Sequence, residues 1–325
     1  MHSPMRLSQP CPKRRSDGVL RTVALMGTFV TIHVVGHVVG HEGELGQTVQ
    51  REEAVDRAFE WFCRVEECCT RFEPNSEVML LANQVGVPVQ VSTILYEAVR
   101  FALAVAEESD GAFDPTVGYA METRGFNREY RTGKTIRSTL DSSRSVNYRD
   151  VRLDADAKRI TLLRPLIFDL GAVAKGLAVD LAARELQPFK DFAIDAGGDL
   201  YLGGCNPDGE PWSIGIRHPR SDHELIDALR ISNRAVCTSG DYERRAPAEE
   251  HGHHILDPRM GSSADAAASV TVIAPNAMLA DALATAAFVL GPAEGIQLFD
   301  RLGVDGLIIS PGLDRHATRG MSDYH

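Results

Sequence analysis

The sequence has 325 residues, of which 44% are hydrophobic and 24% charged, a composition that excludes a fibrous or disordered protein. Its 34 basic and 45 acidic residues give a formal net charge of −11, so the chain has no basic excess with which to bind nucleic acid. It contains no run of about 18 apolar residues, and we therefore predict no membrane span.

The N-terminus, residues 1–18, is basic and rich in Pro and Ser, which predicts a disordered tail. No apolar stretch follows its arginines, so we expect neither a secretory signal nor a lipoprotein signal around Cys11. The six cysteines lack zinc-site spacing and suit a reducing compartment. These features predict a cytoplasmic protein, with action outside the cytoplasm left open.

Beyond the tail, hydrophobic periodicity predicts regular elements as far as residue 310. Residues 119–148 are polar, and we expect an exposed or mobile excursion there. Strands and helices do not alternate regularly, which favours a single α+β domain over 19–325 with largely antiparallel sheets and packed helices. In chain order, the expected elements are two strand segments within 19–36, helices over 51–72 and 93–108, strands over 150–154, 159–164 and 166–169, a helix over 172–187, strands over 191–195, 212–219, 228–233, 234–244 and 269–275, helices over 277–291 and 293–302, and a strand over 304–310.

The stretch FDLGAVAKGLAVD, residues 168–180, has the pattern of a strand that runs into a helix. Asp169 stands where a capping residue belongs, so the amides of residues 171–173 would be free to attract phosphate or another anion. Lys175, one turn into the helix, would add a full positive charge. The alternative is an ordinary strand-to-helix junction with a solvated lysine.

The predicted helix over 277–291 carries few polar residues, and two of them, Asp281 and Thr285, are four apart and share a face. A carboxylate and a hydroxyl among alanines are costly to bury without a partner. Mg²⁺ or Ca²⁺ would satisfy them, since both ions prefer oxygen ligands. The alternative places Asp281 on the solvent side and bonds Thr285 back to a helix carbonyl.

His251, His253 and His254 lie close together and are followed by Asp257. Their spacing does not favour zinc, because no helical His-x-x-x-His occurs. A histidine beside a metal-held phosphate would instead serve to deprotonate a hydroxyl. No G-x-G-x-x-G after a strand, P-loop or G-x-S-x-G is present, which disfavours nicotinamide-binding, P-loop and α/β-hydrolase enzymes.

In their order along the chain, eight segments resemble the ApbE family, the FAD:protein FMN transferases. Each segment alone is weakly specific, whereas the ordered set is highly specific and spans nearly the whole chain beyond the tail. The segments are MGTFVTI (26–32), RFEPNSEV (71–78), GAFDPTVG (111–118), FDLGAVAKGLAVD (168–180), DAGGDLYLGG (195–204), SGDYER (239–244), HHILDPRMG (253–261) and SVTVIAP with ADALATAAFVLG (269–291).

The resemblance implies a Mg²⁺-dependent enzyme that cleaves the pyrophosphate of FAD. It would attach FMN by a phosphoester to a Thr or Ser of an acceptor flavoprotein and release AMP. It also implies two similar halves of the T-fold kind with the flavin in a cleft between them. Carried onto this sequence, the FAD site would include Met26, Phe72, Ala112, Phe113, Asp114, Asp169, Lys175 and Ile255.

By the same resemblance, Asp281, Thr285 and the backbone carbonyl of Ala172 would hold the metal. His254 would activate the acceptor hydroxyl, and Asp257 would orient its loop. The sequence departs from the family pattern at two positions. Ala172 stands where the family often has Gly, and Met260 stands where it often has Thr. Two alternatives stay open: an FAD pyrophosphatase that yields FMN and AMP, and a non-catalytic FAD-binding protein.

Overall fold

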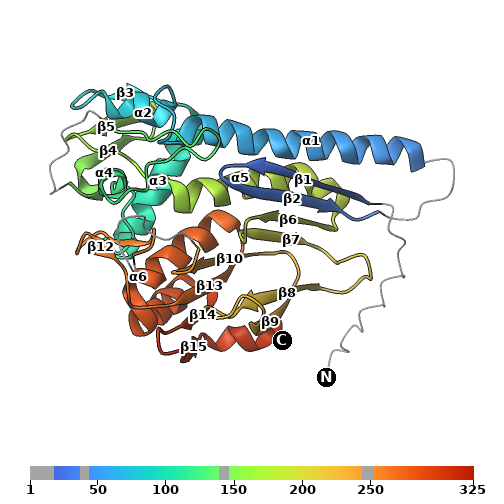
Figure 1. Cartoon of the computed structure of the whole chain (residues 1–325). Coiled ribbons are helices and arrows are strands. Elements are labelled where there is room, and N and C mark those ends of the chain that lie inside the picture. The colour runs from blue at the N-terminus through green and yellow to red at the C-terminus, as the bar shows by residue number, and fades with distance from the viewer. Residues whose placement is uncertain (1–17, 37–43, 139–145, 244–251) are drawn as a thin grey trace, which may run out of the picture.

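The computed structural model describes residues 18–36, 44–138, 146–243 and 252–325 (Figure 1). Its centre is an eight-stranded sheet in which every neighbouring pair of strands is antiparallel. In sheet order, the strands are β1 (Val19–Leu25), β2 (Thr28–Val34), β6 (Phe192–Ala196), β7 (Leu200–Gly203), β10 (Arg234–Gly240), β13 (Ser269–Ala274), β14 (Asp305–Ile309) and β15 (Arg315–Ala317).

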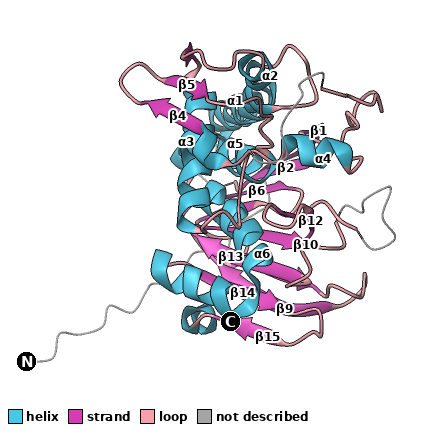
Figure 2. Cartoon of the chain, turned by 90° about the vertical axis from the view of Figure 1, so that its left-hand side faces the viewer, coloured by secondary structure: helices cyan, strands magenta, loops and turns pink. Residues whose placement is uncertain are grey.

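Three long helices cover one face of this sheet (Figure 2). They are α1 (Glu44–Cys69), α5 (Gly171–Leu186) and α6 (Ala277–Leu302). The face is apolar because alternate residues of the strands point to it: Val30, Ile32 and Val34 of β2 are fully buried or nearly so. Packing of the helices against these residues forms the main hydrophobic core.

The other face of the sheet is covered in part by a two-stranded hairpin, β8 (Trp212–Arg217) and β9 (Leu225–Ile231). Leu229 and Ile231 of the hairpin pack with Ile273 and Leu307 of the sheet in a second, smaller core. The C-terminal turn η3 (Arg319–Tyr324) closes this core with Met321.

A smaller region lies beside the end of α1 (Figure 1). It contains α2 (Glu77–Ala82), α3 (Thr93–Glu108), α4 (Gly118–Thr123) and a small sheet with the order β3 (Val89–Gln90), β5 (Arg159–Leu162), β4 (Val151–Asp154). Short 3-10 turns precede β4 (η1, Tyr148–Asp150) and β6 (η2, Gln187–Phe189), and a last hairpin pairs β11 (Leu256–Asp257) with β12 (Ser262–Ser263).

This architecture confirms the prediction of an α+β fold with largely antiparallel sheets. The two predicted helices over 277–302 are joined in α6 across a kink, where Gly291 has φ 78° and Pro292 follows. The division into two similar halves stays a prediction. Residues 1–17 of the tail predicted over 1–18, and His251, lie outside the described residues.

Two expectations need correction. The predicted strand over 166–169 forms only an isolated bridge between Ile167 and Val117, because its backbone bonds a loop: Gly118 N–H donates to Ile167 O, and Asp169 N–H to Pro115 O. The predicted exposed excursion over 119–148 is exposed over 131–135, but Met121, Glu122 and Glu129 are buried and α4 forms within it. Residues 139–145 of that excursion lie outside the described part of the chain.

Within the described part of the chain, α6 is the helix long and apolar enough to cross a membrane by length and composition. Most of its apolar stretch is buried inside the fold against α5, β10 and β13. Core helices of this kind meet the same criteria without spanning a membrane.

Candidate active site

A cavity of about 550 Å³ opens between the helix face of the sheet and the smaller region. This volume is typical of small-molecule sites. Its walls come from the end of α1, the 112–117 loop, the start of α5, β10, the segment 254–258 and the middle of α6. Of the site residues predicted from the sequence, all but Asp257 line it: Met26, Phe72, Ala112, Phe113, Asp114, Asp169, Ala172, Lys175, His254, Ile255, Asp281 and Thr285.

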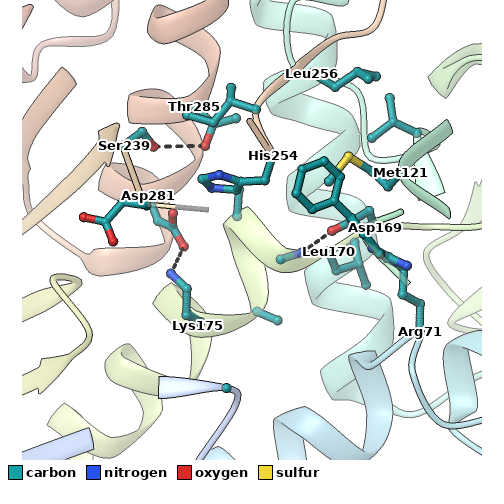
Figure 3. A pocket seen from close by; sticks show the side chains of 18 of the residues that line it. Arg71, Met121, Asp169, Leu170, Lys175, Ser239, His254, Leu256, Asp281 and Thr285 are labelled. Carbon is teal, nitrogen blue, oxygen red and sulfur yellow. Dashed lines mark hydrogen bonds and ion pairs between the residues drawn. The ribbon is translucent and has the colours of Figure 1, made fainter. Parts of the chain in front are cut away.

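The start of α5 forms one wall (Figure 3). Asp169 Oδ1 accepts a hydrogen bond from Gly171 N–H at 3.0 Å. The predicted capping position of Asp169 is nevertheless wrong, because the N-cap of α5 is Leu170 and no side chain caps this helix end. The amides of Gly171 and Val173, predicted to be free, donate to Asp169 Oδ1 and to the Leu170 carbonyl. Ala172 departs from helical geometry, with φ −90° and ψ 15°. The first turn of the helix is therefore kinked where its backbone faces the cavity.

Lys175, Asp199 and Asp281 form a buried charged cluster on this wall. Lys175 Nζ pairs with Asp199 and lies 3.5 Å from Asp281 Oδ2. Both carboxylates are almost fully buried, whereas the lysine side chain keeps partial access to the cavity. One lysine therefore faces two buried carboxylates, which leaves a formal charge of −1 in the cluster and favours a further cation.

Asp281 and Thr285 lie one turn apart on α6 and both face the cavity (Figure 3). Thr285 Oγ1 lies 3.3 Å from Ser239 Oγ of β10, so a second hydroxyl stands beside the first. In the described residues, His, Cys, Asp and Glu form no group of three or more that could hold a metal. A cation here would thus combine one carboxylate with hydroxyl, backbone and substrate oxygens, a donor set that suits Mg²⁺.

Arg71 organises the opposite wall, and its side chain is only 5% exposed. Its Nε donates to Asp169 Oδ2 at 2.8 Å, its Nη2 donates to the Phe126 carbonyl at 2.5 Å, and its guanidinium lies over the Phe72 ring. One side chain thereby joins the end of α1, the 119–138 segment and the start of α5. Asp169 is held on both sides, by Arg71 and by Gly171 N–H.

Asp114 shapes the 112–117 loop. Its carboxylate accepts hydrogen bonds from the backbone and hydroxyl of Thr116 and from Tyr148 N–H. Burial raises the pKa of Asp114, and these bonds oppose that rise. The carboxylate therefore fixes the loop that presents Ala112 and Phe113 to the cavity.

His253 anchors the loop that carries His254. Its ring lies edge-on to Phe288 of α6, Nε2 lies 2.7 Å from the Ala264 carbonyl, and Ile255 N–H donates to Nδ1 at 3.2 Å. These partners require a neutral ring with the proton on Nε2. Burial lowers the pKa of His253, in agreement with a neutral ring. The loop holds the His254 side chain at the cavity, on the side of Thr285 (Figure 3).

Asp257 lies outside the lining and fixes the turn that follows His254. It accepts two bonds from the Arg259 guanidinium and one from Arg259 N–H, while its carbonyl accepts from Gly261 N–H. Burial favours a higher pKa for Asp257, but the bonds from Arg259 keep the pKa below its ordinary value. Met260, at the tip of this turn, is 76% exposed.

Sequence reasoning missed four residues that complete the site: Arg71, Asp199, Ser239 and His253. Arg71, Asp199 and Ser239 lie within segments that carry the family resemblance, which was the available signal. Their partners are far along the chain, so the sequence alone did not reveal the pairing. His253 was considered with its neighbours, but the carbonyl that fixes its tautomer belongs to a different segment.

Residues 26–308 match the family model described as "ApbE family". Proteins named FAD:protein FMN transferase are similar in sequence. The Haemophilus influenzae protein is 31% identical over 67% of this chain and 66% of its own length. The Vibrio cholerae protein is 30% identical over 81% of this chain and 79% of its own length.

Two solved structures share the fold. The ApbE protein of Thermotoga maritima superposes with a TM-score of 0.80 at 30% identity and covers 95% of this chain and 99% of its own. A flavin transferase ApbE from Vibrio cholerae gives a TM-score of 0.78 at 25% identity, with 96% and 100% coverage. The similarity to these relatives identifies the protein as a transferase. Within that class, the chain belongs to the ApbE family.

Proposed function

We propose that this protein is a Mg²⁺-dependent FAD:protein FMN transferase. The observation that carries the proposal is the convergence of Lys175, Asp281, Thr285 and His254, from three separate elements, on one cavity of about 550 Å³. The names of the relatives support FAD and a protein acceptor as the substrates. Phe72 and Phe113 offer aromatic surface suited to a flavin or an adenine ring.

The cluster around Lys175 is suited to the diphosphate of FAD. Lys175 would offer its charge to a phosphate oxygen, while Asp199 holds the ammonium group in place. Asp281, Thr285 and the carbonyl of Ala172 would hold Mg²⁺. When bound, this ion supplies electrostatic stabilisation of the charge that develops on the diphosphate.

His254 would act as the general base. Its ring would accept the proton of the acceptor Thr or Ser hydroxyl as the oxygen attacks the FMN phosphorus. The new phosphorus–oxygen bond forms as the bond to the bridging oxygen breaks, and the electron pair leaves with AMP. Asp257 would act indirectly, since its hydrogen bonds fix the turn that follows His254.

The decisive experiment incubates the protein with FAD, MgCl₂ and a peptide that carries one acceptor threonine, followed by mass spectrometry of the peptide. Transfer predicts a covalent FMN adduct and an equal amount of AMP. Free FMN and AMP without an adduct would instead show the pyrophosphatase. Bound FAD that stays uncleaved would show a non-catalytic FAD-binding protein.

We further propose that the acceptor is a cytoplasmic flavoprotein, since the five cysteines in the described part of the chain are free thiols, which suits a reducing compartment. Mass spectrometry of flavoproteins from cells with and without this protein tests the assignment. A modified cytoplasmic flavoprotein, present only in the first sample, is the expected result. A modified protein found only outside the cytoplasm would contradict it.

A further inference from the structure

The helices that carry Lys175 and Asp281, α5 and α6, approach closely at Gly176. Gly176 of α5 lies against the start of α6, where a Cβ atom on this glycine would stand 2.5 Å from Met278 Cα and 2.6 Å from the Ala277 carbonyl oxygen. Any larger residue would have to push backbone away. The glycine therefore sets the smallest separation that the two helices adopt.

Asp180 joins the same helices by hydrogen bonds. It lies four residues after Gly176 and so shares its helix face. Its Oδ1 accepts from Ala277 N–H at 2.7 Å and its Oδ2 from Met278 N–H at 3.0 Å. A side chain of α5 thus satisfies the first two amides of α6, groups that have no partner within their own helix.

A second side chain caps the same helix end from within. Asn276 accepts a hydrogen bond from Leu279 N–H at 2.9 Å. The two caps differ in one respect: Asn276 adjoins α6 in the chain, whereas Asp180 belongs to α5. Only Asp180 therefore couples the position of α6 to that of α5.

The residues at this crossing lie next to the charged side chains of the cavity. Lys175 immediately precedes Gly176, and Asp281 lies one turn after Ala277 on α6. Because a helix moves as a rigid unit over one turn, the position of residues 277–278 relative to α5 also fixes the position of Asp281 relative to Lys175 and Ala172. The distance of 3.5 Å between Lys175 Nζ and Asp281 Oδ2 depends on this crossing.

From this geometry we infer that Asp180 and Gly176 form a clasp between α5 and α6 that positions the metal-holding oxygens of Asp281 and Thr285 against Ala172 and Lys175. Asp180 is a positioning residue, since its carboxylate bonds backbone amides and lies outside the cavity lining. The inference rests on the proposed function, because the clasp would position residues that are proposed there to hold the cation.

The clasp acts through an ionised carboxylate. Burial raises the pKa of Asp180 to about 6, while the two amide bonds and the charge of Arg184 oppose the rise. Measurements at pH 8 therefore keep the clasp in its anionic, bonded form.

The test compares three full-length variants at pH 8: Asp180→Ala, Gly176→Ala and, as the matched control, Asn276→Ala. Mn²⁺ binding is measured by electron paramagnetic resonance, FAD binding by fluorescence in EDTA, and thermal stability by circular dichroism. We expect the two clasp variants to weaken Mn²⁺ binding about tenfold or more, the size typical of residues that support metal ligands. FAD affinity without metal should change by less than about threefold.

The control separates positioning from helix capping. Asn276→Ala also removes a cap from α6, so its melting temperature should fall, but its Mn²⁺ affinity should stay within about twofold of the wild type. Equal losses of Mn²⁺ affinity in Asn276→Ala and Asp180→Ala would overturn the clasp, as would unchanged affinity in Asp180→Ala. If Asp180→Ala fails to fold, Asp180→Asn, which keeps one acceptor oxygen, replaces it in the comparison of Mn²⁺ affinities with Asn276→Ala.

A crystal structure of one clasp variant tests the helix crossing directly. In a crystal structure of Gly176→Ala, the start of α6 should move away from α5 and the Lys175–Asp281 distance should exceed 3.5 Å. An unchanged crossing would overturn the inference. Absence of Mn²⁺ binding by the wild type would overturn both the metal site and the clasp. The transferase activity in the proposed function is tested separately, by FMN transfer to the acceptor peptide.

Discussion

The two walls of the cavity are built in different ways. On the α5–α6 wall, helices carry Lys175, Asp281 and Thr285, and the charged groups face one another across a close crossing. The loop wall consists of the loops and turns that carry Phe72, Phe113 and His254, with the His254 side chain reaching the side of Thr285, and single side chains such as Arg71 and His253 hold those loops in place. Helices position charge with little freedom, whereas loops adapt to ligands more readily. Under the proposed function, the helical wall would bind the diphosphate and the metal, and the loop wall would bind the rings of FAD and the acceptor.

The largest effect is expected on the helical wall. Asp281→Ala removes the one carboxylate on α6 that faces the cavity, so Mg²⁺-dependent turnover should fall on the order of 10³-fold or more. Steady-state assays across a MgCl₂ titration measure the loss, and circular dichroism verifies the fold. Asp300→Ala, at an exposed position of the same helix, is the control and should keep full activity. Wild-type turnover by Asp281→Ala would remove Asp281 from the metal site.

The second effect tests the chemistry of the loop wall. His254→Ala should reduce kcat for transfer by roughly 10²–10⁴-fold, the contribution typical of a general base. The Kd for FAD should change little, because Lys175 and Asp281, the charged groups proposed to act on the diphosphate, stay in place. His316→Ala, at an exposed position of β15, is the control. A parallel loss of FAD binding and rate would identify His254 as a binding group and not as the base.

The third effect tests whether the loop wall depends on single side chains. Arg71→Met keeps roughly the volume of the side chain but removes the buried bonds from Arg71 to Asp169 and to the Phe126 carbonyl, so the unfolding free energy should fall by about 3 kcal/mol and the KM for FAD should rise. Denaturant unfolding and steady-state kinetics measure the two changes.

Arg64→Met supplies the matched control for that variant. Arg64 lies on α1, shortly before the turn that carries Arg71, and both side chains of its ion pair with Glu60 are exposed to solvent. Its loss should cost less than about 1 kcal/mol. Equal destabilisation by the two substitutions would show that Arg71 has no special part in the wall.

The smallest effect concerns pH. The pKa of His253 is lower in the folded protein than in the unfolded chain, because burial disfavours its charged form. The unfolded chain therefore binds more protons below about pH 6.5, and the stability contributed by the neutral ring is present above that pH and lost as the pH falls. His253→Gln keeps a donor for the Ala264 carbonyl and cannot titrate. Between pH 7.5 and 5.5 its unfolding free energy should fall less than that of the wild type; equal falls would exclude His253 as a source of acid sensitivity.

The sequence predicted the helical wall more completely than the loop wall, for physical reasons. Helical periodicity is local, so the spacing of Asp281 and Thr285 and the position of Lys175 could be read directly. The apolar run 166–168 was expected to form a strand, but the partner that bonds its backbone is a loop, so it forms no strand ladder.

The groups that stayed hidden have distant partners. To predict that Asp199 belongs to the site, one must know that β7 lies beside β6 and near α5. To predict the same of Arg71, one must know that residues 126 and 169 lie close to it. The short strands β3 and β15 carry too few residues for a period to show. Tertiary pairing, which single-sequence patterns do not encode, accounts for these omissions.

The separation of the cavity residues along the chain also determines when the cavity forms during synthesis. Arg71 and Asp169 are 98 residues apart, and Lys175 and Asp281 are 106 residues apart. Contacts of such long range close late in folding. A growing chain that has not yet emerged as far as α6 exposes the apolar faces of α1 and α5 and lacks Asp281, so neither the charged cluster nor the cavity is complete until the C-terminal region is made.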